Sequence, residues 1–128
     1  METMKPRVLL ADDEIHIRAM MKAVIKIMGY DVAAEAANGQ EAIDRFREVK
    51  PDITLLDINM PVKMGTETLK EIIAAQPGAC VIMLTSVSDL SSVQECIDFG
   101  AANYIRKDTP IAEMKTAIAE TWKAHKSE

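Results

Sequence analysis

The stretch VLLADDE (residues 8–14) joins a run of apolar residues directly to three acids. A short apolar run of this kind is typical of a buried strand, so the charges stand where that strand should end. After the acids, apolar residues recur every three or four positions up to Gly29, which predicts an amphipathic helix that ends at this glycine. The stretch therefore predicts a β-α unit with carboxylates at the carboxyl end of its strand.

The same alternation of strand and helix patterns continues along the chain. Strands are expected at 8–11, 30–36, 52–57, 79–85 and 103–106. After the first helix, four further helices are expected. The first of these begins at Asn38, with Glu41 completing a capping box, and the next begins at about Thr66. A helix capped by Ser88 or Asp89 should reach Phe99, and the last helix should begin at Thr109 with Pro110 in the first helical position. Parallel strands need crossover connections, and those connections are right-handed helices. We therefore expect one α/β domain over 1–128, a flavodoxin-like doubly wound sheet of five parallel strands in the order 2-1-3-4-5 with five helices.

Composition excludes several classes of function. The formal net charge of −5 disfavours direct binding of nucleic acid through its phosphates. Cys80 and Cys96 do not form a C-x-x-C pair and are expected to be buried free thiols, which suits a reducing cytoplasm. No stretch approaches the length of a membrane span, so we expect a cytoplasmic protein with no membrane partner.

Polar residues follow four of the expected strands at the point where each strand ends. These residues are Asp12 and Asp13, Asp57, Thr85, and Lys107. Sites in doubly wound sheets form beyond the carboxyl ends of the strands, so these side chains should meet at one edge. Carboxylates about 5 Å apart repel by roughly 3 kcal/mol per pair at an effective dielectric of about 20. A cation would relieve that repulsion, and hard oxygen ligands without histidine or thiol suit Mg²⁺.

This set of residues favours phosphoryl transfer to a carboxylate. Asp57 would attack phosphorus, Lys107 would neutralise the phosphoryl charge, and the Thr85 hydroxyl would donate to a phosphoryl oxygen. There is no G-x-x-x-x-G-K-[ST] sequence, so the phosphoryl donor should come from outside as a phosphorylated protein or small molecule.

The chain resembles the CheY-like receiver domain of bacterial two-component response regulators. The resemblance rests on the acid pair after the first strand, on DINMP (residues 57–61) with Gly65 following, and on Thr85 and Lys107 at the ends of strands four and five. It implies that Asp57 is the phosphoacceptor and that Asp13, Asp57 and the backbone carbonyl of Asn59 bind Mg²⁺. It also implies that Asp12 binds the metal through water or supports it, and that Tyr104 is an aromatic switch with Thr85.

The resemblance further implies partners. A sensor histidine kinase or phosphotransfer protein would supply the phosphoryl group, and an output protein would bind the face formed by helix 4, strand 5 and helix 5. Receivers of this kind often dimerise through that face when phosphorylated, so a phosphorylation-dependent homodimer is one expectation. Self-phosphorylation and self-dephosphorylation would not make the protein an enzyme in the ordinary sense. One departure is Asp108, which stands where the family commonly has a proline in a cis peptide; here we expect a trans bond.

Other interpretations compete with this one. Asp12 and Asp13 could simply cap the first helix. A flavin-binding electron carrier would need a phosphate-binding loop after the first strand, where the acids of this chain would repel a phosphate. A haloacid-dehalogenase-like phosphatase would need a general acid at the position of Asn59. A pseudo-receiver that only binds partners, or the receiver portion of a longer DNA-binding regulator, stays open. Val87, two residues after Thr85, is expected to slow hydrolysis of a phosphorylated site by hindering water.

Overall fold

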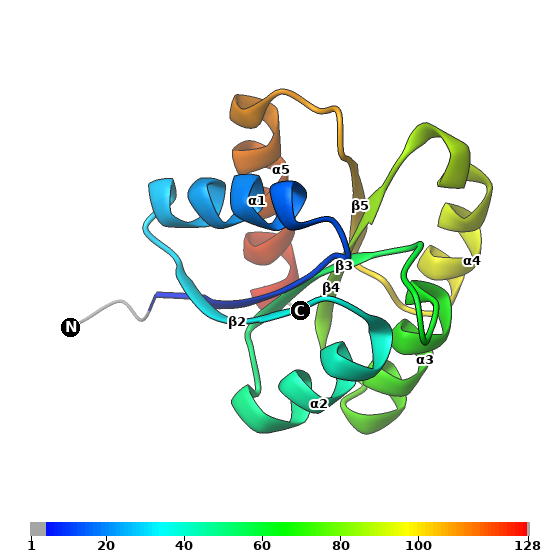
Figure 1. The fold of residues 1–128 in the computed structure, drawn as a ribbon. Helices are drawn as coiled ribbons and strands as arrows, with labels where there is room; N and C mark the ends of the chain where they lie inside the picture. The colour runs from blue at the N-terminus through cyan, green and yellow to red at the C-terminus, as the bar shows by residue number, and fades with distance from the viewer. Residues whose placement is uncertain (1–4, 128) are drawn as a thin grey trace.

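The computed structural model describes residues 5–127 and contains one five-stranded parallel sheet in the order β2-β1-β3-β4-β5 (Figure 1). The strands are β1 (Arg7–Ala11), β2 (Asp31–Ala36), β3 (Ile53–Asp57), β4 (Cys80–Thr85) and β5 (Asn103–Arg106). The helices are α1 (Ile15–Ile27), α2 (Gly39–Val49), α3 (Gly65–Ala75), the 3₁₀ helix η1 (Val87–Ser92), α4 (Val93–Asp98) and α5 (Ile111–Lys126). The expected strand order and flavodoxin-like fold are confirmed, while residues 1–4 and 128 of the expected domain lie outside the described residues.

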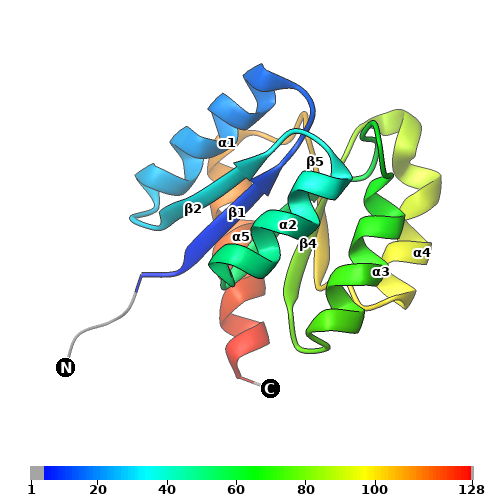
Figure 2. The same cartoon turned by 60° about the horizontal axis from the view of Figure 1, so that its bottom comes forward.

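Helices cover both faces of the sheet. Figures 1 and 2 show α1 and α5 on one face and α2, α3 and α4 on the other. Successive residues of a strand point to opposite faces, so Val8 and Leu10 pack with α1 and α5 while Leu9 and Ala11 pack beneath the other layer. This two-sided burial explains why the strand is a continuous apolar run instead of an alternating one.

The start of α2 follows the expected capping pattern. The backbone N–H of Glu41 donates to Asn38 Oδ1 at 2.9 Å. The Glu41 carboxylate in turn accepts from the N–H of Ala37 at 2.9 Å, one residue earlier than in the usual capping box. Local side-chain chemistry therefore fixes this helix start, as the sequence predicted.

Two expected helix starts are wrong. Neither Ser88 nor Asp89 caps an α-helix; η1 intervenes, and α4 begins only at Val93. The Ser86 hydroxyl donates to the Asp89 carboxylate at 2.9 Å, which occupies the side chain that was expected to cap. Pro110 is not the first helical residue but the residue before it, with an extended ψ of 145° and a carbonyl that accepts from the N–H of Met114 at 3.0 Å.

The loop between β3 and α3 is held tightly against the end of β3. The N–H of Gly65 donates to the carbonyl of Ile58 at 2.8 Å, and a Cβ on Gly65 would lie 2.0 Å from the Asp57 carbonyl oxygen. Within the loop, Val62 has a positive φ of 69°, and the N–H of Lys63 donates to the Pro61 carbonyl at 2.7 Å across it. Only glycine fits at position 65, where the backbone comes this close to β3. At position 62 the positive φ strains the β-branched side chain of Val62.

Two further points concern the chain as a whole. Residues 5–127 contain no cis peptide bond, so the trans bond expected between Lys107 and Asp108 is confirmed. Among the same residues, no helix combines the length and the apolar character that crossing a membrane requires.

Candidate functional site

Side chains at the carboxyl ends of β1 and β3 meet the side chain of Lys107, which follows β5. Its Nζ lies 2.9 Å from Asp12 Oδ2, 3.1 Å from Asp57 Oδ2 and 3.0 Å from Glu14 Oε1. Asp12 directly follows β1, and Asp57 is the last residue of β3. The convergence predicted from strand order is therefore present, and one ammonium group is shared by three carboxylates.

Burial makes this cluster electrostatically costly. The side chains of Asp12 and Asp57 are each 2% exposed and that of Lys107 is 14% exposed. Burial, and then the charge of Asp12, raise the pKa of Asp57 to about 7, although Lys107 opposes the rise. Burial alone would lower the pKa of Lys107, but its contacts with the carboxylates of Asp12, Glu14 and Asp57 raise that pKa above the usual range. The site therefore holds more negative charge than its lysine neutralises.

Three carboxylates lie close enough to hold one metal ion. Asp12, Asp13 and Asp57 each offer an oxygen within 4.8 Å of the others. Asp12 Oδ2 and Asp57 Oδ2 are buried and accept no hydrogen bond of ordinary geometry from the described residues. Asp13 is exposed and faces the surface depression beside the cluster. Hard oxygens that lack donors suit a divalent cation such as Mg²⁺, so the residues present fit the metal expected from the sequence.

The first acid of the cluster also shapes the start of α1. Asp12 Oδ1 accepts from the N–H of Glu14 at 2.8 Å, and Glu14 is the residue that precedes the helix. The capping interpretation is wrong, because the N-cap of α1 is Glu14 and no side chain caps the helix. Asp12 Oδ1 instead shapes the turn before α1, while Oδ2 faces Lys107.

The other three residues of the expected site are Asn59, Thr85 and Tyr104, and they differ in how they relate to the acid cluster. Asn59 is exposed, and its N–H donates to Asp57 Oδ1 at 3.3 Å. Thr85 ends β4 and is fully buried, and its hydroxyl donates to the carbonyl of Ser86 at 2.9 Å. Tyr104 lies on β5 beside Met83 and is 41% exposed. The structure thus joins Asp12, Asp13, Asp57 and Lys107, with Asn59 adjacent, while Thr85 is turned to its own backbone and Tyr104 faces outward.

No role was predicted for Glu14, although it stands in the quoted acidic run. Its carboxylate crosses the edge of the sheet to Lys107, 93 residues away, and the contact with Lys107 holds the pKa of Glu14 below its usual range. The acidic run 12–14 was the available signal for Glu14. The rule that site residues directly follow a strand selects only Asp12 and Asp13, and Glu14 reaches Lys107 because its side chain is long.

A depression of about 240 Å³ opens over the cluster. It is lined by Asp13, Glu14, Asp57, Asn59, Ser86, Ser88, Asp89 and Lys107. A larger depression of about 590 Å³ lies beside Gly78, Gly100 and the last turns of α5, without any residue of the acid cluster. The smaller depression is the candidate functional site because it holds the charged groups.

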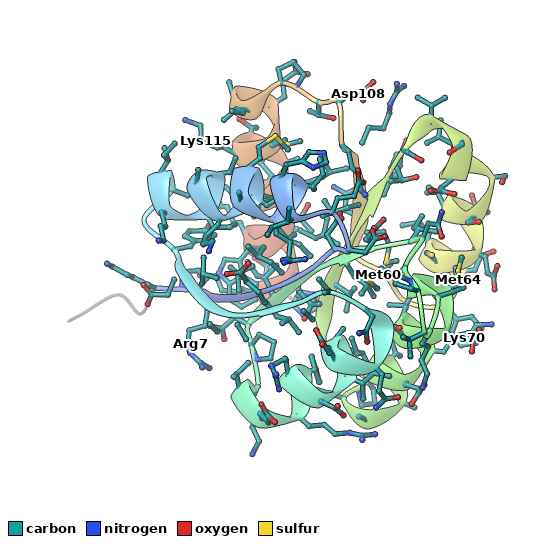
Figure 3. The ribbon with its side chains drawn as sticks, viewed as in Figure 1. Arg7, Met60, Met64, Lys70, Asp108 and Lys115 are labelled. Atoms are coloured by element: carbon teal, nitrogen blue, oxygen red, sulfur yellow. The ribbon has the colours of Figure 1, made fainter. Side chains whose placement is uncertain are left out.

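Asp108 pairs with Arg106 in the loop that follows the lysine. Its carboxylate accepts two hydrogen bonds from the Arg106 guanidinium, at 2.7 and 3.0 Å, and both side chains are exposed. Figure 3 shows Asp108 in the loop between β5 and α5, and Met60 and Met64 in the loop that follows β3. The two loops border the site from different strands.

The comparisons with known proteins agree with this geometry. Residues 8–119 match the family model of the response regulator receiver domain. The chain belongs to this family. The receiver is 41% identical over 104 residues to the chemotaxis protein CheY of Thermotoga maritima, covering 81% of this chain and 87% of that protein. It is 38% identical over 113 residues to protein CcdB of Bacillus subtilis, covering 88% and 92%.

Solved structures share the fold as well. The receiver superposes on the CheY-like receiver domain protein of Methanospirillum hungatei with a TM-score of 0.88 at 26% identity, over 97% of this chain and 98% of that one. The receiver is therefore a CheY-like domain of two-component signalling, as the resemblance implied.

Proposed function

We propose that this receiver accepts a phosphoryl group on Asp57 in an Mg²⁺-dependent reaction. The observation that carries the proposal is the buried Asp57 carboxylate, 3.1 Å from the Lys107 ammonium and within 4.8 Å of the oxygens offered by Asp12 and Asp13. A lone strand-end aspartate would need none of these neighbours. Their combination fits a carboxylate that gains further negative charge during its reaction.

The chemistry assigns a role to each group. Asp57 Oδ forms a bond to phosphorus while the bond from phosphorus to the nitrogen of a phosphohistidine, or to the acyl oxygen of acetyl phosphate, breaks and leaves its electron pair on that atom. Lys107 would pair with a phosphoryl oxygen. Mg²⁺, held by Asp13, Asp57 and the Asn59 carbonyl with Asp12 in support, would supply charge neutralisation when bound.

Phosphorylation would then shift the population of the face made by α4, β5 and α5. The Thr85 hydroxyl would leave the Ser86 carbonyl, to which it now donates, and would donate to a phosphoryl oxygen. Movement of Thr85 would make room for Tyr104, whose ring is now 41% exposed, to turn inward. An output protein, or a second copy of the receiver, would bind the changed face. The phosphoryl donor would be a sensor histidine kinase or a phosphotransfer protein, in the cytoplasm.

Two features bear on the alternatives. Asn59 stands where a phosphatase of the aspartyl-phosphate type would carry its acid, so the receiver would react once on itself and not turn over external phosphoesters. The transcriptional regulatory protein LnrK of Bacillus subtilis is 37% identical over 80% of this chain, which spans only 47% of that protein. The receiver of a longer regulator is therefore the second candidate.

The test is intact-mass spectrometry after incubation with acetyl phosphate and Mg²⁺. Wild type should gain one phosphoryl group, and Asp57→Asn or removal of the metal should abolish the gain. Asp44→Asn, which removes an exposed carboxylate on α2, should leave the gain intact. A folded wild-type protein that binds Mg²⁺ and gains no mass would instead support the pseudo-receiver, and a modified Asp57→Asn variant would place the chemistry on another residue.

A further inference from the structure

Among the described residues, Glu14 is the hydrogen-bond partner of the Lys107 ammonium, with Oε1 at 3.0 Å from Nζ. The oxygens of Asp12 and Asp57 lie as close, at 2.9 and 3.1 Å, but these are ion pairs without hydrogen-bond geometry. A phosphoryl oxygen on Asp57 that draws the ammonium toward itself would therefore compete with the Glu14 carboxylate for it.

The three partners differ in how easily they can leave. Asp12 and Asp57 are 2% exposed, and each belongs to the acid cluster that a metal would hold. Glu14 is 45% exposed and stands at the start of α1, so its carboxylate can turn into water without loss of hydration. An ion pair with so exposed a partner is weak, which makes Glu14 the contact that breaks at least cost.

We propose that Glu14 is a positioning residue that restrains Lys107 in the unphosphorylated receiver and competes with the phosphoryl group for its ammonium. This inference rests on the proposed function, because it concerns the same transfer to Asp57. Glu14 would then set how readily the site accepts a phosphoryl group, and it would act through Lys107 without touching phosphorus.

Charge alone could produce a similar effect, so the control must remove the same charge from the same depression. Asp89 provides this control: it lines the depression, its carboxylate accepts from the Ser86 hydroxyl, and it makes no ion pair with Lys107. Asp89→Asn measures the through-space contribution of one carboxylate. The excess effect of Glu14→Gln over Asp89→Asn measures the contact with Lys107.

The experiment measures the phosphorylation rate with acetyl phosphate and Mg²⁺ by intact mass, and the affinity for beryllium fluoride with Mg²⁺ by calorimetry. Glu14→Gln should raise both about two- to fivefold more than Asp89→Asn does, the range expected for an exposed ion pair. In a Lys107→Met background, Glu14→Gln and Asp89→Asn should have equal effects on beryllium fluoride affinity.

Three outcomes are distinct. Equal effects of Glu14→Gln and Asp89→Asn in the presence of Lys107 would overturn the restraint. An excess effect that persists without Lys107 would also overturn it, because Glu14 would then act by another route. Absence of any phosphorylation in wild type would instead count against the proposed function, while beryllium fluoride binding would still report on the contact.

Discussion

Replacement of Asp57 by asparagine should stabilise the metal-free protein. Asp57 is buried beside Asp12, and its pKa rises from 3.8 to about 7 for this reason. At about 1.4 kcal/mol for each pH unit between the two values, an ionised Asp57 costs the folded state up to about 4 kcal/mol relative to the unfolded chain. An amide carries no charge, so Asp57→Asn should gain about 2–4 kcal/mol at pH 8 without metal.

The pH dependence gives the sharper test. The folded protein keeps a proton on Asp57 up to a higher pH than the unfolded chain does, so this residue makes wild-type stability fall as pH rises from about 4 to about 7. Above about 7 both states are ionised and the contribution is level. The advantage of Asp57→Asn should therefore be about 2 kcal/mol smaller at pH 5 than at pH 8.

Urea unfolding with a chelator present, followed by circular dichroism, measures these free energies. The matched control is Asp44→Asn, an exposed change on α2 that should stay within about 0.5 kcal/mol of wild type at both pH values. Excess Mg²⁺ should stabilise wild type more than Asp57→Asn, because the variant would lose one charged ligand of the proposed metal site. An Asp57→Asn variant no more stable than wild type at pH 8 without metal would refute the view that uncompensated charge destabilises the site.

Three further predictions concern the loops around the site. Val62→Asn should raise the unfolding free energy by about 1 kcal/mol in urea, because Val62 has a φ of 69° and is 79% exposed, so that strain is relieved while little packing is lost; a loss of stability would contradict this. Gly65→Ala should lower the unfolding free energy by about 2 kcal/mol or more, since the new Cβ would lie 2.0 Å from the Asp57 carbonyl oxygen. Gly78→Ala, where a Cβ would meet nothing within 4 Å, should have little effect, and similar losses for both variants would count against the close approach at Gly65. Val87→Glu should speed loss of the phosphoryl group several-fold in a mass-spectrometric time course, and equal rates would remove the basis for a hydrophobic barrier to water.

The fold was predictable because the strand runs leave few choices. Every residue of 8–11 is buried, and the same holds for β3 and β4, so apolar length alone marked the central strands. The crossover rules predicted a parallel sheet, and the order expected for a flavodoxin-like sheet was the one observed. The convergence of Asp12, Asp57 and Lys107 followed from that order. No pairwise signal in the sequence was needed for this part of the site.

The errors have local causes that sequence patterns do not resolve. Ser86 and Asp89 pair with each other, so capping residues that look available to a helix are already occupied. Pro110 fits either the first helical position or the one before it, and its extended ψ of 145° decides for the latter. Glu14 was missed because its partner depends on side-chain reach across strands, which a strand-end rule does not describe.

The acids that follow β1 are tolerated only in part. Lys107 cancels one of the four charges carried by Asp12, Asp13, Glu14 and Asp57, and burial together with the charge of Asp12 still raises the pKa of Asp57. A phosphoryl group on Asp57 would replace one negative charge by about two. Its stabilisation would then require both a divalent cation and a Lys107 ammonium that is free to pair with a phosphoryl oxygen. The residual charge that is expected to weaken the metal-free fold would thus also favour metal binding, and the proposed Glu14 restraint would set how much of Lys107 is free to respond.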